Sequence, residues 1–338
     1  MKLESMLTTF VYFPYLSAAP GSMRIFFDDV CAALEDAGHD VVAVSITAAS
    51  GAWRTISLPA GLCTGMGRLD SAMLGVIARG AVRRVPRERM AIIDLSQEFI
   101  LNARLDRSLV IFHDTIQLDR PRSRGIAMLM RQAIARSRRA ARVVAVSRTT
   151  ARDLARFGVE SSVVYNHFDL ERFRGFRRPA DAPAYDAVWC GTPAPHKRLD
   201  LFSALARAEP THRFAAVLPG AVPVGLPANI TVLSGIGPDA YLALLAGAGM
   251  LISTSEQEGY GRPPMEALML GTPALVSDIP VYREVYGDVA DFFALDADAL
   301  IRAYRAVASR PRPATINWPA LLTRQGHTQD YVRLLAAL

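Results

Sequence analysis

Lysine and cysteine are scarce in this chain of 338 residues. Only two of its 38 basic residues, Lys2 and Lys197, are lysines, so nearly every positive charge is carried by arginine. The three cysteines, Cys31, Cys63 and Cys190, stand far apart in the sequence. Such a set provides neither a disulfide framework nor the close spacing of a metal site. We therefore expect a protein of a reducing, cytoplasmic compartment.

Long apolar runs and the common nucleotide-binding loops are also missing. No stretch of 18 apolar residues runs without a charge or a cluster of glycine and proline, and the N-terminal segment lacks the apolar core of a secretory signal. We expect no membrane span. Neither G-x-x-x-x-G-K-[ST] nor G-x-G-x-x-G occurs, which argues against a P-loop NTPase and a dehydrogenase.

Short apolar runs alternate with longer helical patterns along the whole chain, the rhythm of parallel βαβ units. In the first half the predicted strands are 7–13, 41–46, 91–94, 109–112, 143–147 and 163–165. In the second half they are 186–190, 214–218, 230–233, 250–254 and 274–277. The pattern predicts an α/β protein with two doubly wound parallel sheets in tandem, whose ligands bind beyond the carboxyl ends of the strands.

A segment rich in proline and alanine separates the two halves. Residues 175–184 lack periodicity and lie between two predicted strands. The net charge is +7 over residues 1–175 and −1 over residues 176–338. We therefore predict one domain over 1–174, a linker over 175–184 and a second domain over 185–318.

The densest motif of the second half is an acidic, glycine-rich loop that runs into a helix. Glu258 lies in the loop, whereas Pro263 and Pro264 open the helix that carries Glu266 and ends at Gly271. Taken alone, Glu266 could simply complement the helix dipole, and the glycines could form an ordinary tight turn.

The segment E-G-Y-G-R-P-P-M-E-A, however, resembles the signature of the retaining glycosyltransferases of family 4. The resemblance implies the GT-B fold, in which two Rossmann-like domains face a cleft. It also implies that Glu258 contacts hydroxyls of the transferred sugar and that Glu266 binds the ribose of a nucleotide. Backbone N–H groups of Gly259, Tyr260 and Gly261 would meet the sugar and the diphosphate.

A second motif, V-W-C-G-T-P-A-P-H-K-R-L-D, follows the linker. Its Lys197 is a compact cation in a chain that otherwise uses arginine, which suits a phosphate site, although a solvated surface lysine is the alternative. The segment is similar to a loop of the same family with Gly191, Thr192 and Lys197 in register. The resemblance implies that the lysine binds the leaving diphosphate.

In the first half, His113 follows the predicted strand 109–112. A buried structural histidine is the ordinary interpretation, but the segment H-D-T-I resembles the acceptor-side histidine motif of the family. Gly21 precedes the first predicted helix, where a turn could direct N–H groups at a phosphate, or where the helix could simply be capped. The resemblance further implies that the tail, residues 319–338, packs back on the first domain.

Nine arginines and no acidic residue occur between Arg120 and Arg148. Apolar residues at helical spacing place most of these arginines on the opposite face of a helix over about 123–141, and a solvated face is the default interpretation. This charge would also suit an anionic membrane or nucleic acid. Because no nucleic-acid-binding motif accompanies it, we favour peripheral association with the inner face of the plasma membrane and expect no nucleic-acid partner.

Asp296-Ala-Asp298 could pass for a metal-binding D-x-D motif. It immediately precedes a predicted helix over 299–307, where an aspartate is a favoured N-cap. We therefore expect neither an essential metal nor a cofactor.

The resemblance as a whole implies a retaining transferase. It would move a hexose, with GDP-mannose the first choice of donor and a UDP-sugar the second, to a glycan or a lipid-linked oligosaccharide. Two alternatives stay open: a sugar-nucleotide epimerase or phosphorylase on the same fold, and a non-catalytic scaffold at the membrane surface.

Overall fold

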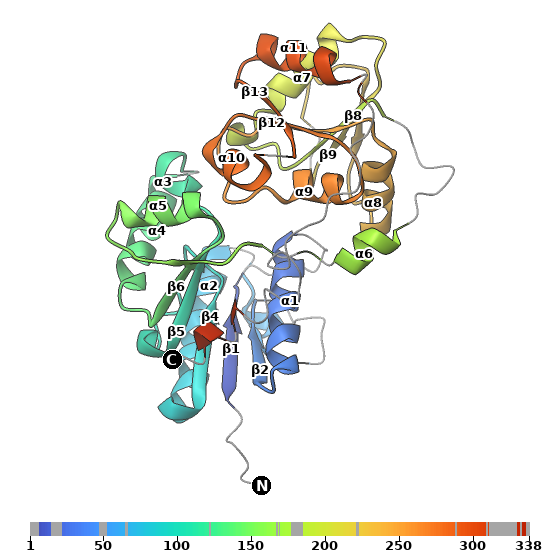
Figure 1. Ribbon diagram of the computed structural model, residues 1–338. Coiled ribbons are helices and arrows are strands. Elements are labelled where there is room, and N and C mark those ends of the chain that lie inside the picture. Colours follow the sequence, from blue (N-terminus) through green and yellow to red (C-terminus); the bar gives the residue numbers. More distant parts are fainter. Residues whose placement is uncertain are drawn as a thin grey trace. The chain divides into compact units, whose positions relative to one another are not determined.

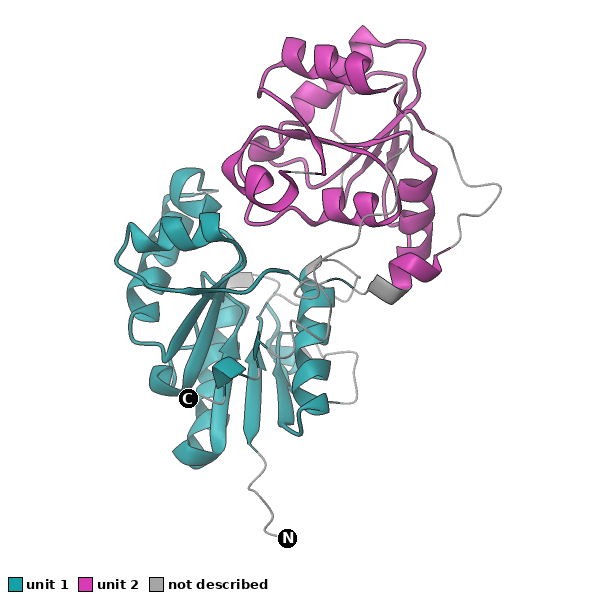
Figure 2. Cartoon of the chain, viewed as in Figure 1, with its two compact units in different colours: residues 1–168, 319–338 teal, residues 169–318 magenta. Residues whose placement is uncertain are grey.

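The computed structural model divides into two compact units, residues 1–168 with 319–338, and residues 169–318 (Figure 2). It describes residues 7–14, 22–46, 53–64, 67–121, 123–166, 168, 170–176, 185–220, 223–287, 289–308, 310, 330–331 and 333–335. The sequence-based boundary lay at residue 174, whereas helix α6 (Leu170–Gly175) here groups with the second unit. In that unit Arg172 of α6 forms an ion pair of 3.2 Å with Asp239.

The first unit is built on a parallel sheet with the strand order β3-β2-β1-β4-β5-β6-β7 in its described residues (Figure 1). The strands are β1 (Thr8–Tyr12), β2 (Asp40–Val44), β3 (Arg54–Ile56), β4 (Met90–Asp94), β5 (Ser108–Phe112), β6 (Arg142–Ala145) and β7 (Ser162–Val163). The α-helices are α1 (Ser22–Asp36), α2 (Gly67–Arg83), α3 (Ile116–Asp119), α4 (Arg124–Ser137) and α5 (Arg148–Ala155). Helix α2 packs Leu74 and Ala78 against Phe10 and Tyr12 of strand β1.

The second unit has a parallel sheet with the order β10-β9-β8-β11-β12-β13. Its strands are β8 (Ala187–Cys190), β9 (Phe214–Val217), β10 (Ile230–Leu233), β11 (Leu251–Ser253), β12 (Ala274–Ser277) and β13 (Asp291–Phe293). Its further α-helices are α7 (Leu199–Ala208), α8 (Pro238–Gly247), α9 (Arg262–Met269), α10 (Pro280–Tyr286) and α11 (Ala297–Val307). Helices α7 and α11 lie side by side, and their Phe202 and Tyr304 share one core (Figure 1). Leu244 of α8 and Ala267 of α9 belong to a second core.

The predicted pair of doubly wound parallel sheets is confirmed, because every strand pairing in both units is parallel. Two strands, β3 and β13, were not predicted. Each has three residues and lies at a sheet edge. Within the described ranges, no helix has the length and apolar character needed to cross a bilayer.

Each sheet has one point where the strand order reverses direction. In the first unit this switch point lies between β1 and β4, and in the second it lies between β8 and β11. Loops that leave the carboxyl ends of these strands diverge to opposite faces of the sheet, and ligands of doubly wound sheets bind in the crevice they create. The loops after β8 and β11 are therefore the first place to look for a site.

Gly249, between α8 and β11, provides a test of the close backbone packing in the second unit. A Cβ at this position would lie 2.5 Å from the backbone oxygen of Asp186, so Gly249→Ala requires a backbone shift. We expect a loss of about 1–3 kcal/mol in the free energy of unfolding, measured by denaturant titration. Gly80→Ala is the control: it lies in helix α2 with nothing within 4 Å, and it should stabilise the protein by roughly 0.5–1 kcal/mol. Equal effects of the two variants would contradict the close packing at Gly249.

Candidate active site

The loops after β8 and β11 bring Lys197 and Glu258 into contact. Lys197 ends a short 3-10 turn (Pro195–Lys197), and Glu258 lies in the loop before α9. The Lys197 Nζ forms an ion pair with Glu258 Oε1, and the two side chains are 20% and 12% exposed. Two residues of different predicted motifs, 61 positions apart, thus meet at the switch point of the second sheet.

Hydrogen bonds of Thr254 fix the spacing between these two loops. The Thr254 hydroxyl donates to the backbone oxygen of Lys197 at 2.7 Å and accepts from Trp189 Nε1 at 2.9 Å. The Glu256 N–H donates to the backbone oxygen of His196 at 2.8 Å. Because Thr254 and Trp189 are buried, water does not compete for these bonds. Buried hydrogen bonds therefore fix the position of the backbone that carries the ion pair.

Three donors converge on one oxygen of Glu258. In addition to Lys197, the Ser255 hydroxyl donates to Oε1 at 2.8 Å and the Tyr282 hydroxyl lies 3.4 Å from it. Burial, together with the charge of Glu258, raises the pKa of Tyr282 well above its usual value, so this hydroxyl stays protonated. Among the described residues no side chain bonds Oε2, so this oxygen can accept a hydrogen bond from a ligand.

Gly261 is the tightest position of the glycine-rich loop. Its φ is +83°, and a Cβ would lie 2.4 Å from Tyr282 Cε1, so only glycine fits. The backbone oxygen of Gly261 accepts a hydrogen bond from the buried Tyr286 hydroxyl. Gly259 and Tyr260 are buried beside it. The loop backbone is thereby fixed before any ligand is present.

The other predicted residues of the β8 loop differ in how tightly they are packed. A Cβ on Gly191 would come within 3.0 Å of the Trp189 ring, so a side chain there would need the indole to move. Thr192 is exposed to solvent. Gly21, predicted to direct N–H groups at a phosphate, lies outside the described residues.

Glu266 lies in α9 and is only 9% exposed. Pro residues occupy the first turn of α9, and Gly271 follows the helix with φ of +74°, as the sequence predicted. The Tyr241 hydroxyl of α8 donates to Glu266 Oε2 at 2.8 Å, and Arg262 Nε lies 3.4 Å from Oε1. Sequence analysis missed Tyr241, Tyr282 and Ser255 as partners of the two glutamates.

In the first unit, His113 follows β5 directly. Its ring packs edge-on against Phe26 of α1, with centroids 5.0 Å apart. The backbone N–H groups of His113 and Asp114 donate to the amide oxygen of Gln97 at 2.7 and 3.2 Å. Gln97 has φ of +32°, which is rare for a residue with a side chain. The loop after β4 thus holds the loop after β5, and sequence analysis did not identify Gln97.

Asp94, at the carboxyl end of β4, holds the loop that carries Gln97. Its carboxylate accepts hydrogen bonds from the Ser96 N–H at 3.0 Å, the Ser96 hydroxyl at 2.6 Å and the Leu101 N–H at 2.5 Å. Burial raises the pKa of Asp94 to about 6, although these bonds oppose the shift. The carboxylate therefore ties down the loop that carries Gln97.

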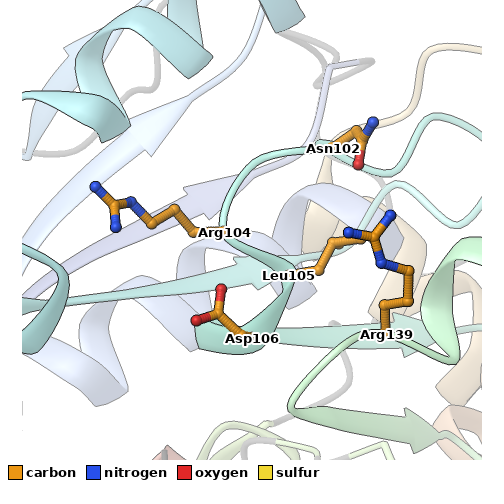
Figure 3. A pocket seen from close by; sticks show the side chains of 5 residues that line it. All are labelled: Asn102, Arg104, Leu105, Asp106 and Arg139. Atoms are coloured by element: carbon orange, nitrogen blue, oxygen red, sulfur yellow. The ribbon is translucent and has the colours of Figure 1, made fainter.

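A pocket of about 350 Å³ lies elsewhere in the first unit. It is lined by Asn102, Arg104, Leu105, Asp106 and Arg139 (Figure 3). These residues precede β5 and β6, at the opposite end of the sheet from His113. The side chains of Arg104 and Arg139 extend in different directions, and Asp106 is paired with Arg87 at 2.6 Å. The pocket contains none of the predicted site residues.

Asp296 caps a helix, as predicted. Its side chain accepts from the Ala299 N–H at 2.7 Å at the start of α11. Among the described residues, no group of three histidine, cysteine or acidic side chains could hold a metal ion.

Burial lowers the pKa of His113 to about 4, so its imidazole is neutral at pH 7. We expect its nitrogen NMR shifts to titrate with a midpoint near that value, with the signals assigned by their loss in His113→Gln. Because the ordinary value of 6.5 returns on unfolding, His113 lowers the stability of the fold as the pH falls from about 6.5 to about 4. A midpoint near 6.5 would show that the ring is hydrated.

Two family models match the chain. The first, Glycosyltransferase Family 4, matches residues 23–172, and the second, Glycosyl transferases group 1, matches residues 222–308. Curated relatives match over short segments. The Escherichia coli serotype-specific mannosyltransferase WbdA is 32% identical over 93 residues, which are 25% of this chain and 11% of WbdA. The Salmonella typhimurium O-antigen chain mannosyltransferase RfbU is 40% identical over 57 residues, 17% of this chain and 16% of RfbU.

Solved structures resemble the chain over nearly its whole length. Sucrose-phosphate synthase from Thermosynechococcus elongatus has a TM-score of 0.72 at 18% identity and covers 98% of this chain and 100% of its own. Anabaena HepE, in complex with UDP and glucose, has a TM-score of 0.68 at 16% identity with the same coverage. At this identity the likeness establishes the fold. With the two family models, which match both units, it shows that the chain belongs to the group 1 glycosyltransferases of family 4, with the GT-B fold.

Proposed function

We propose that the protein is a retaining glycosyltransferase that moves a hexose from a nucleotide diphosphate sugar to a glycan or lipid-linked acceptor. The observation that carries the proposal is the contact between Lys197 and Glu258 at the switch point of the second sheet. GDP-mannose is the first candidate donor, since WbdA and RfbU are named mannosyltransferases. A UDP-sugar is the second, since HepE has been crystallised with UDP-glucose.

In this proposal donor binding exchanges the partners of the ion pair. The Lys197 ammonium leaves Glu258 for the diphosphate, and Glu258 accepts hydrogen bonds from the sugar hydroxyls. As the glycosidic bond breaks, negative charge develops on the diphosphate, and Lys197 stabilises it in a site largely shielded from water. The acceptor hydroxyl attacks from the face that the diphosphate leaves, and its proton passes to the departing phosphate oxygen.

The rigid loop before α9 supplies the remaining contacts with the donor. Gly259, Tyr260 and Gly261 present backbone N–H groups to the sugar and diphosphate, and Glu266 accepts from the ribose. Preorganised backbone donors cost no reorganisation when charge develops on the leaving group. Gly191 and Thr192, which follow β8, complete the diphosphate site.

His113 serves the acceptor side in its neutral form. Its Nε2 is buried and has no hydrogen-bond partner among the described residues. A neutral imidazole can accept or donate one hydrogen bond there, which suits a ring that positions a sugar or acceptor hydroxyl. The tie to Gln97 fixes the backbone from which the ring projects.

Replacement of the ion-pair residues tests the proposal. We expect Lys197→Ala and Glu258→Ala each to lower sugar transfer from GDP- or UDP-sugars to a membrane extract by at least about tenfold, or roughly 1.4 kcal/mol in the barrier. Arg302→Ala, which removes an exposed cation of α11 in the same unit, should leave transfer unchanged. Unchanged transfer in both site variants would refute the assignment and favour a scaffold. Release of free sugar without acceptor, or a requirement for phosphate, would instead indicate an epimerase or a phosphorylase.

We also propose that the arginine-rich segment 120–148 contacts an anionic membrane. All of its described arginines are exposed: Arg120, Arg124, Arg131, Arg136, Arg138, Arg139, Arg142 and Arg148. Buried Met130, Ala133 and Ile134 hold the other face of α4 against the sheet. On the outward face Met128, 56% exposed, lies between Arg124 and Arg131 at helical spacing. An apolar side chain among cations suits the headgroup region of a bilayer.

Vesicle sedimentation tests this surface. Each basic residue near an anionic bilayer contributes about 1 kcal/mol, so replacing Arg124, Arg131 and Arg136 together by glutamine should weaken binding to phosphatidylglycerol vesicles at least tenfold. The same replacement at Arg83, Arg84 and Arg89, also exposed in the first unit, changes the net charge equally and should have a smaller effect. Equal losses would mean that net charge, not this helix face, governs binding.

A further inference from the structure

We propose that Tyr241, together with Arg262, is a positioning residue that orients the Glu266 carboxylate toward the ribose hydroxyls of the nucleotide. The inference rests on the proposed function, in which Glu266 binds the ribose. Tyr241 lies on α8, outside both motifs, and reaches the carboxylate across the contact between α8 and α9. Its hydroxyl donates to Oε2 at 2.8 Å, whereas Arg262, one turn before Glu266, lies 3.4 Å from Oε1.

Each of the two partners contacts a different oxygen of the Glu266 carboxylate. An ionised carboxylate offers about four acceptor positions, two on each oxygen. Tyr241 takes one position on Oε2, and Arg262 interacts with Oε1, so each oxygen keeps a position for another donor. A vicinal diol supplies two hydroxyl donors side by side, which matches this pair. The arrangement leaves Glu266 suited to the 2′- and 3′-hydroxyls of one ribose.

Burial explains why the carboxylate needs these partners. Glu266 is 9% exposed, and an ionised group removed from water is costly unless it is paired and hydrogen-bonded. Arg262 supplies the compensating charge, and Tyr241 supplies a directional bond. Without the tyrosine hydroxyl, the carboxylate would retain its charge partner but could rotate away from the diol.

Tyr241 can act only as a donor to this carboxylate. Burial and the charge of Glu266 raise its pKa well above the usual value, and the Cys190 thiol of β8 also interacts with it. The hydroxyl is therefore protonated at any physiological pH. A phenylalanine in its place would keep the ring packing and remove the bond.

Nucleotide binding by calorimetry tests the role of the hydroxyl. The probes are whichever of GDP and UDP binds the wild-type protein more tightly, and its 2′-deoxy form. We expect Tyr241→Phe to weaken binding of the ribonucleotide about tenfold and binding of the deoxynucleotide much less. The ratio of the two dissociation constants, which measures the preference for ribose, should therefore fall toward one. In turnover, the donor KM should rise more than kcat falls.

Three further variants separate the outcomes. Tyr304→Phe removes another hydroxyl of the second unit, bonded to His212 at 2.9 Å away from the site, and should keep the ribose preference. Arg262→Gln should reduce the preference as Tyr241→Phe does, which provides a second test if Tyr241→Phe folds poorly. If Glu266→Gln abolishes the preference but Tyr241→Phe and Arg262→Gln keep it, the positioning role is wrong. If Glu266→Gln also keeps it, Glu266 does not bind ribose, and the proposed donor site itself fails.

Discussion

The contact between Lys197 and Glu258 is the interaction on which the proposed donor site depends. Both side chains are mostly buried, so each charge needs a partner before a ligand arrives. Without the pair, the ammonium would be largely removed from water and have no counter-charge. The carboxylate would keep only the hydroxyl groups of Ser255 and Tyr282. The ion pair thus supplies each charge with a partner, and in the proposed reaction a diphosphate sugar would replace both partners without leaving either charge isolated. The parallel sheet, by placing β8 beside β11, makes the contact possible.

In the proposed reaction the ion pair exchanges partners, and the residues around it would let this happen without disturbing the fold. Thr254 bonds the backbone of Lys197, not its side chain, so the loop stays in place when the ammonium moves. Ser255 and Tyr282 likewise remain on Oε1 of Glu258 and keep that carboxylate oriented. The polar network therefore separates two tasks. Backbone and hydroxyl groups set the geometry, and in the proposed reaction only the two charges change partners.

Periodicity and local motifs predicted much of this structure, because both are properties of consecutive residues. The alternation of apolar runs identified the two sheets. Pro263 and Pro264, which open a helix, placed Glu258 in the loop before it and Glu266 within it. Tyr241, Tyr282 and Gln97 could not be found in this way. Each lies on a different element from the residue that it holds, and which elements touch depends on packing of the whole unit. Gln97 also required a positive φ that no propensity scale assigns to glutamine.

The proposed exchange of partners would also account for a lysine at position 197. The neighbouring Arg198 shows what a guanidinium does in this loop: it binds Asp200 through two nitrogens at 2.8–3.2 Å, a planar two-point contact that resists rearrangement. An ammonium has no such fork and can turn from a carboxylate to a phosphate while keeping a hydrogen bond to each in turn. In a chain that uses arginine almost everywhere else, lysine stands where, in the proposed reaction, one cation would bind two partners in succession. The different geometries of the guanidinium and ammonium groups thus explain why a chain with so few lysines would use one at the proposed site.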